Sequence, residues 1–195
     1  MVTGVWHPRG GHAGYSLAEL LVVVGLTTVL AVISVFGASH ALEYLRGENG
    51  LTLLESQLRF ARSLAINQRR LTEVVFISPN EIRIMRHDLP EGSTLVSQVF
   101  FEGHIGYMNF PGLPDTPDGF GAGAAVNFGA SSRVGFAADG MLVDVTGPSA
   151  AGAPVNGTVF LGRTGADETA WAVTVFGRTG HVRGYRWDGT AWIES

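Results

Sequence analysis

An uncharged apolar run from Leu20 to Ala38 limits, more than any other feature, what this chain of 195 residues can fold into. At a rise of 1.5 Å per residue, a helix of this length spans the roughly 30 Å of hydrocarbon in a bilayer. One carboxylate, Glu19, stands directly before the run. A charged side chain inside a bilayer costs at least about 2.5–3.5 kcal/mol and is usually functional. We therefore expect a membrane-embedded helix in which Glu19 has a specific partner.

The residues before the run have the character of a processing signal. They form a short, glycine-rich head with His7, Arg9 and His12 as its basic side chains. A secretory signal peptide would place a small-residue cleavage site after the apolar run, but residues 35–40 match that pattern only loosely. Two alternatives follow: an uncleaved signal-anchor helix, or cleavage before the run, between Gly14 and Tyr15.

The segment from residue 14 to residue 24 resembles the type IV prepilin signal, with Gly14 before the cleaved bond, the aromatic Tyr15 after it and Glu19 as the fifth mature residue. The resemblance implies that a prepilin peptidase removes residues 1–14 and that Tyr15 becomes N-methylated. It further implies that Glu19 pairs with the amine of Tyr15 on a neighbouring subunit. The family more often has Phe at the first mature position and a basic residue next to the glycine, whereas this chain has Tyr15 and the more distant Arg9.

The same resemblance implies a location and a set of partners. The chain would be a single-pass protein of the inner membrane with its globular domain in the periplasm. It would assemble with other pilin or pseudopilin subunits into a type IV pilus or a type II secretion pseudopilus.

Residues 39–71 keep the helical period of the apolar run but become amphipathic. Leucines and alanines recur at spacings of three and four, which places them on one helix face: Leu51, Leu54, Leu58, Ala61 and Ala65. The sequence thus predicts one stem helix with a transmembrane and assembly half at 15–38 and an amphipathic half at 39–71. The segment 47–50 begins and ends with glycine, which costs about 1 kcal/mol relative to alanine in a helix, so a kink is possible there.

From residue 72 onward the pattern changes to the period of two that is typical of strands. Strands are predicted at 73–77, 81–85, 95–101, 133–136, 141–145, 158–162, 171–176 and 182–187, with long loops at 110–125 and 146–156. Residues 72–195 should therefore form an antiparallel β domain. The expected fold class is α+β, a long N-terminal stem helix packed on that domain.

Composition and motifs argue against several kinds of chemistry. The net charge is −4, and the loss of a leader containing one arginine makes the chain slightly more acidic, so no global field favours nucleic acid. Cysteine is absent, the histidines lack metal-ligand spacing, and no nucleophile-elbow motif frames a serine. The segment 119–123 lacks the lysine that follows a phosphate-binding loop. We expect no enzyme activity, no metal and no cofactor.

Two further segments, 58–66 and 177–187, resemble the GspH/FimT-type minor pilins and pseudopilins. In that subgroup an Ala-Arg-Ser segment ends the stem helix, here Ala61 to Ser63, and a Gly-Arg turn precedes the last strand, here Gly177 and Arg178. The resemblance implies a minor, structural subunit of the filament.

Three arginines near the C-terminus, Arg178, Arg183 and Arg186, form a local basic cluster. Arginine next to aromatic residues suits phosphate pairing and base stacking. Some members of the resembled subgroup are DNA receptors, so a DNA-binding minor pilin that acts in DNA uptake is the alternative function. The competing interpretation is that these arginines are solvated or pair with Asp167, Glu168 and Asp188.

Overall fold

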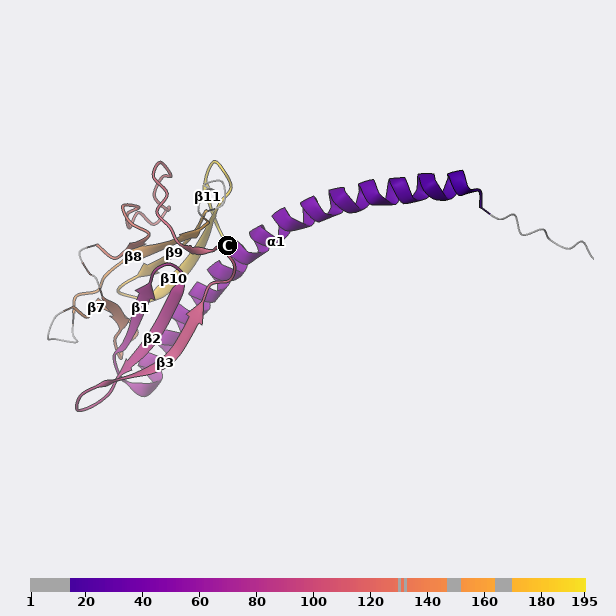
Figure 1. Cartoon of the computed structure of the whole chain (residues 1–195). Helices are drawn as coiled ribbons and strands as arrows, with labels where there is room; N and C mark the ends of the chain where they lie inside the picture. The colour runs from indigo at the N-terminus through magenta and orange to yellow at the C-terminus, as the bar shows by residue number, and fades with distance from the viewer. Residues whose placement is uncertain (1–14, 130, 132, 147–151, 164–169) are drawn as a thin grey trace, which may run out of the picture. The chain divides into compact units, whose positions relative to one another are not determined.

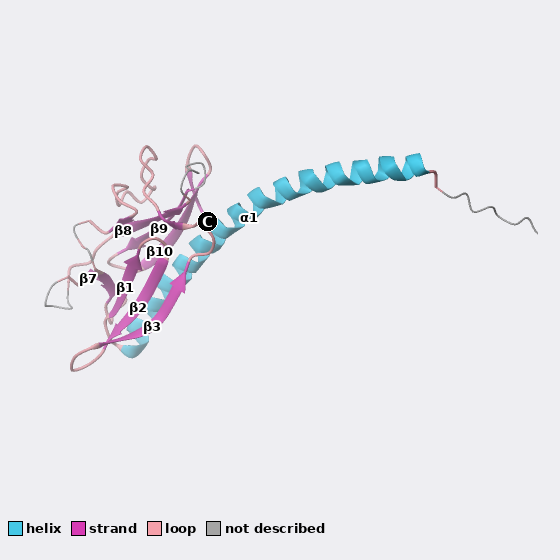
Figure 2. Cartoon of the chain, viewed as in Figure 1, coloured by secondary structure: helices cyan, strands magenta, loops and turns pink. Residues whose placement is uncertain are grey.

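The computed structural model of the protein describes residues 15–129, 131, 133–146, 152–163 and 170–195. The chain divides into two compact units, Met1–Ala41 and Leu42–Ser195. Helix α1, Leu17–Gln68, begins in the first unit and ends in the second, and the strands β1 to β11 follow it (Figure 2). Gly14 and the remainder of the predicted leader lie outside the described residues.

The end of α1 is fixed by local backbone geometry. Arg69 has a φ of 50°, the left-handed conformation that stops a helix. The amide of Arg70 donates to the carbonyl of Ala65 and the amide of Arg69 donates to that of Ile66, which is the pattern of a Schellman motif. The helix therefore ends at Gln68, before the predicted boundary at residue 71.

The first sheet has five strands in the order β3-β2-β1-β6-β7, and its strand pairs are antiparallel. Its strands are β1 Thr72–Ile77, β2 Glu81–His87, β3 Ser93–Phe100, β6 Val134–Phe136 and β7 Leu142–Asp144. In its register Val74 lies between Ile84 and Val134. All three side chains are buried, so this face of the sheet belongs to the core.

The second sheet has the order β11-β10-β9-β8-β4, with β5 also paired to β8, and it too is antiparallel. Its strands are β4 Gly106–Tyr107, β5 Val126–Asn127, β8 Gly157–Gly162, β9 Ala170–Phe176, β10 His181–Trp187 and β11 Trp192–Glu194. The central strand β9 is buried on both faces, because Trp171 and Val173 lie in one hydrophobic cluster and Ala172 lies in another.

The larger cluster joins α1 to both sheets (Figure 1). The predicted apolar face of the helix is confirmed, since each of its side chains is at most 2% exposed: Leu51, Leu54, Leu58, Ala61 and Ala65. They pack with Val74 and Ile84 from the first sheet and with Val159 and Val173 from the second. Residues 42–68 of α1 are thus packed on antiparallel sheets, which gives the unit Leu42–Ser195 the expected α+β arrangement.

The smaller cluster lies on the opposite face of the second sheet and includes Phe110, Phe160, Tyr185 and Trp192. The predicted loop 110–125 covers this face. Trp192 Nε1 donates a hydrogen bond of 2.8 Å to the carbonyl of Pro114, which fixes the loop to β11. The loop 110–125, which is rich in glycine and proline, is therefore part of the packed domain.

The segment 47–50 is part of the continuous helix α1, so the helix is not broken there. Gly47 serves close packing instead, because a Cβ at this position would lie 2.0 Å from Cη2 of Trp171. The Trp171 indole also donates a hydrogen bond of 3.0 Å to Glu48 Oε1. Glycine at this position allows the close approach of the indole ring.

Candidate assembly site and basic groove

The predicted assembly residues lie at the N-terminal end of α1. The Glu19 amide donates to Ser16 Oγ over 3.2 Å, and the Leu20 amide donates to the Ser16 carbonyl. Ser16 is therefore the N-cap, and the Ser-x-x-Glu spacing is that of a capping box. Tyr15 and Glu19 are both exposed, and the Glu19 carboxylate has no partner among the described residues.

The segment Leu17–Ser34 is long and apolar enough to span a membrane, and none of it is buried. Its hydroxyl groups are satisfied within the helix: Thr27 and Thr28 donate to the carbonyl of Val24, and Ser34 donates to that of Leu30. These polar side chains therefore need no water, as a hydrocarbon environment requires. Glu19 carries the segment's one charged side chain.

The three arginines of the predicted DNA-binding cluster are not brought together. Arg183 and Arg186 are three residues apart on β10, so their side chains leave opposite faces of the sheet. Arg183 Nη1 lies 3.1 Å from Asp118 Oδ1, whereas Arg186 donates to the Tyr44 hydroxyl on α1. Arg178 is exposed in the turn between β9 and β10.

The acidic partners proposed for these arginines are also different from those observed. Asp188 accepts hydrogen bonds from the amides of Thr190 and Ala191 in its own turn, while Asp167 and Glu168 lie outside the described residues. Arg183 pairs with Asp118 of the loop 110–125 and with Glu194 of β11, whereas the partners of Arg186 lie on α1. Two of the three cations are therefore engaged by groups distant in sequence.

Asp118 is a buried carboxylate that sequence reasoning did not identify. Its side chain is 6% exposed and accepts hydrogen bonds from Thr174 Oγ1 at 2.6 Å, Tyr185 Oη at 2.9 Å and Arg183 Nη1 at 3.1 Å. Thr174 and Arg183 are register partners on β9 and β10. Asp118 thus fastens the loop 110–125 to the middle of the second sheet, and its role is structural.

A basic groove lies between the C-terminal part of α1 and the turn that joins β9 to β10. It has a volume of about 500 Å³ and is lined by Arg59, Arg62, Ser63, Ile66, Asn67, Gly180, His181 and Val182. Arg62 Nε donates to the carbonyl of Gly140 over 3.2 Å. Gly180 has a φ of +60°, and a Cβ there would lie 2.6 Å from Arg62 Nε. The groove thus unites the Ala-Arg-Ser segment of the helix with the turn that contains Gly177 and Arg178.

Glu55 lies next to this groove in the interior of the unit. Arg59 Nη2 lies 2.8 Å from Glu55 Oε2, and a Cβ at Gly184 would lie 2.0 Å from Glu55 Oε1. Burial raises the pKa of Glu55, and the charge and hydrogen bond of Arg59 oppose that rise. The absence of a side chain at Gly184 leaves the space that this carboxylate occupies against β10.

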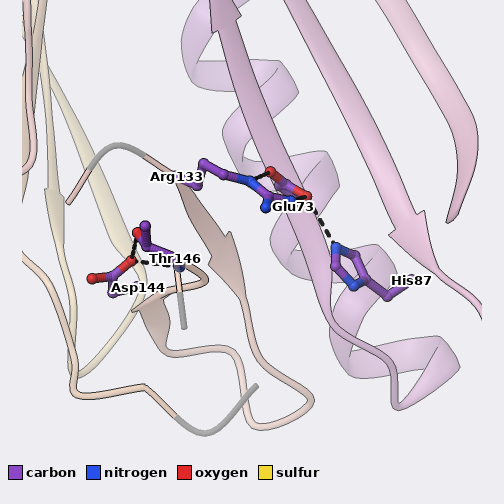
Figure 3. A network of polar contacts seen from close by, with 5 residues as sticks. All are labelled: Glu73, His87, Arg133, Asp144 and Thr146. Atoms are coloured by element: carbon purple, nitrogen blue, oxygen red, sulfur yellow. Dashed lines mark hydrogen bonds and ion pairs between the residues drawn. The ribbon is translucent and has the colours of Figure 1, made fainter. Parts of the chain in front are cut away.

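A separate polar network on the first sheet is centred on Glu73 (Figure 3). Its carboxylate accepts two hydrogen bonds from Arg133, of 2.6 and 2.7 Å, and its Oε2 lies 3.0 Å from His87 Nε2. Burial alone would raise the pKa of Glu73, but the hydrogen bonds from Arg133 and His87 outweigh burial and lower it. The nearby Asp144 carboxylate accepts the Thr146 amide in a separate turn.

The lowered pKa of Glu73 predicts a pH dependence of folding. Because the carboxylate is more acidic in the folded than in the unfolded state, its stabilisation is complete above the ordinary value of 4.5 and is lost as the pH falls through the lowered folded pKa. Glu73→Gln should remove about 1 kcal/mol at neutral pH and flatten the acid limb of the stability curve. Urea unfolding between neutral and acidic pH measures this; an acid limb that is unchanged in Glu73→Gln would contradict it.

Comparisons with protein-family models, with curated proteins and with solved structures find no match. Among the described residues, no group of three or more His, Asp and Glu side chains is placed to hold a metal ion.

Proposed function

We propose that this chain is a minor pilin or pseudopilin, a structural subunit that a prepilin peptidase processes and that assembles into a type IV pilus or a type II secretion pseudopilus. One observation carries the proposal. The apolar segment Leu17–Ser34 is wholly exposed and continues, in the same helix, into a face that is buried in the β domain. A single helix thus combines an unpartnered apolar half with an anchored half.

The exposed apolar half of α1 needs an apolar partner. Exposed apolar surface of this extent is unstable in water and marks contact with lipid or with other apolar helices. The free Glu19 carboxylate then requires a cation near the edge of that apolar environment. Cleavage after Gly14 would create such a cation, the amine of Tyr15, on every subunit. The proposed location is the inner membrane, with the β domain in the periplasm before assembly.

The mature N-terminus tests the proposal. Coexpression of the full-length chain with a prepilin peptidase should give a product that begins at N-methylated Tyr15, as mass spectrometry of the N-terminal peptide will show. Gly14→Val should keep the full-length mass, because the small residue before the cleaved bond is lost. Ser39→Val, a change after the apolar run, should leave processing unchanged. An intact N-terminus, or cleavage near residues 35–40, would refute the proposal.

A role in DNA uptake is the second candidate, but no contact among the described residues favours it. Arg183 is paired with Asp118, and Arg186 is directed to α1 on the other side of the sheet. A nucleic-acid surface would need several cations on one face to neutralise successive phosphates. We therefore retain the structural role as the proposed function.

A further inference from the structure

We propose that the basic groove between α1 and the β9–β10 turn binds side-chain carboxylates of an acidic segment on a neighbouring protein subunit. The identification of the partner as a subunit rests on the proposed function. The chemistry of the groove does not, because it follows from the donors, the shape and the charge of this site.

The groove contains guanidinium groups whose N–H donors are not all used in contacts among the described residues. Arg62 uses its Nε for the carbonyl of Gly140, and its terminal nitrogens have no partner among the described residues. The Arg59 side chain is 60% exposed and contacts Glu55 and the Val182 carbonyl through Nη2. A guanidinium offers a planar pair of N–H groups that matches a carboxylate. Two such groups, one helical turn apart on α1, can hold neighbouring carboxylates.

The shape of the groove suits a short stretch of peptide. Its volume of about 500 Å³ is within the range of sites that enclose small ligands. Ile66, 39% exposed, and Val182 provide apolar contact for the methylene groups of Asp or Glu side chains. Ser63 and Asn67 add neutral hydrogen-bonding groups on the helix side. Apolar contact together with convergent polar groups is typical of a specific binding site.

The basic side of the groove is held in place before any ligand binds. The Gly140 carbonyl fixes the Nε of Arg62, and the absence of a side chain at Gly180 leaves room for the guanidinium. A fixed donor loses less conformational entropy on binding than a free arginine side chain does. The same contacts explain why the turn requires glycine at a φ of +60°.

The charge distribution favours acidic protein over nucleic acid. The net charge of −4 repels acidic protein and nucleic acid alike, so the number of local contacts decides between them. Arg183 and Arg186 are engaged elsewhere, so the groove and the exposed Arg178 in the adjoining turn provide few phosphate contacts. DNA binding at moderate salt needs more than these. A partly enclosed groove with two guanidinium groups fits a pair of carboxylates better.

The test uses full-length protein in detergent micelles and fluorescence anisotropy with three labelled probes: hexaglutamate, hexaglutamine and a short DNA duplex. We expect hexaglutamate to bind and hexaglutamine not to bind. The double change Arg59→Gln and Arg62→Gln should weaken hexaglutamate binding by about tenfold or more, because two charge-assisted contacts are lost. Arg83→Gln and Arg86→Gln together remove two positive charges from β2 outside the groove, and they should change binding by less than about twofold. The single change Arg83→Gln should have no larger effect.

Three results would overturn the inference: binding of hexaglutamine as strong as that of hexaglutamate, equal loss of binding in Arg83→Gln, or a preference for the DNA duplex that the groove variant removes. The last would assign the groove to nucleic acid. Because Arg62 also contacts the Gly140 turn, Arg59→Gln alone gives an independent variant that leaves this contact in place: it should still weaken hexaglutamate binding while near-ultraviolet circular dichroism reports the fold. Processing at Gly14 does not involve the groove, so failure here leaves the proposed function intact.

Discussion

Trp171→Ala should lower the free energy of unfolding of the unit Leu42–Ser195 by about 3–5 kcal/mol, the usual cost of replacing a large buried aromatic side chain with alanine. The indole is 1% exposed and lies in the cluster that joins α1 to both sheets. Its removal also leaves Glu48 without the indole N–H that it accepts over 3.0 Å. Urea unfolding of the full-length protein in micelles, followed by far-ultraviolet circular dichroism, measures the loss.

The contact between Trp171 and Gly47 makes this prediction more specific. In the natural sequence Gly47→Ala should cost about 1–3 kcal/mol, because the added Cβ would lie 2.0 Å from the indole ring. In the Trp171→Ala protein the ring is gone, and Gly47→Ala should instead be neutral or stabilising by up to about 1 kcal/mol through helix propensity. The exposed neighbour Asn49→Ala is the control and should behave alike in both proteins. Additive effects of the Gly47 and Trp171 changes would exclude the proposed contact.

Regular periodicity explains which parts of the fold were predictable. The face that contains Leu51, Leu54 and Leu58 follows from spacing alone. Strands such as β1 and β9 were also predictable, because they have six and seven residues and are rich in β-branched and aromatic side chains. The strands β4, β5 and β11 have only two or three residues, which is too short for a period to be visible. Their pairing depends on neighbours distant in the chain.

The glycines show the limit of local reasoning. Gly47 and Gly50 suggest a weak point of the helix when propensity alone is considered, whereas the structure gives both a packing role. Gly47 lies against Trp171, and a Cβ at Gly50 would lie 3.2 Å from Ile105. The space that a glycine leaves is decided by residues more than fifty positions away, and no local pattern contains that information.

The arginine cluster illustrates a different limit. Closeness in sequence suggested one basic surface, but a spacing of three on a strand separates Arg183 from Arg186, and this much follows from the strand period itself. The pairing of Arg183 with Asp118 does not follow from the strand period. Asp118 lies in a loop of glycine and proline, and only the tertiary fold brings it to β10. The same is true of the groove, where Arg62 and Gly180 meet through the packing of α1 on the second sheet.

If the proposed function is correct, Glu19→Gln should abolish incorporation of the subunit into filaments, with processing at Gly14 largely unchanged. Glutamine keeps the size and polarity of the side chain but cannot form an ion pair with the amine of Tyr15 on a neighbouring subunit. An unpaired amine at the edge of an apolar environment raises the free energy by about 3 kcal/mol. That free energy is enough to reduce assembly by about a hundredfold. Quantitative immunoblotting of sheared filaments against the membrane fraction measures incorporation.

The N-cap at Ser16 provides the control that separates pairing from helix stability. Ser16→Ala removes the hydroxyl that accepts the Glu19 amide and should cost about 1 kcal/mol of local helix stability, but it leaves the carboxylate in place. If Glu19 acts by pairing with an amine, Ser16→Ala assembles nearly normally while Glu19→Gln does not. If Glu19 acts only as a capping residue at the helix N-terminus, the two changes impair assembly to the same extent, and the assembly role of its charge is refuted.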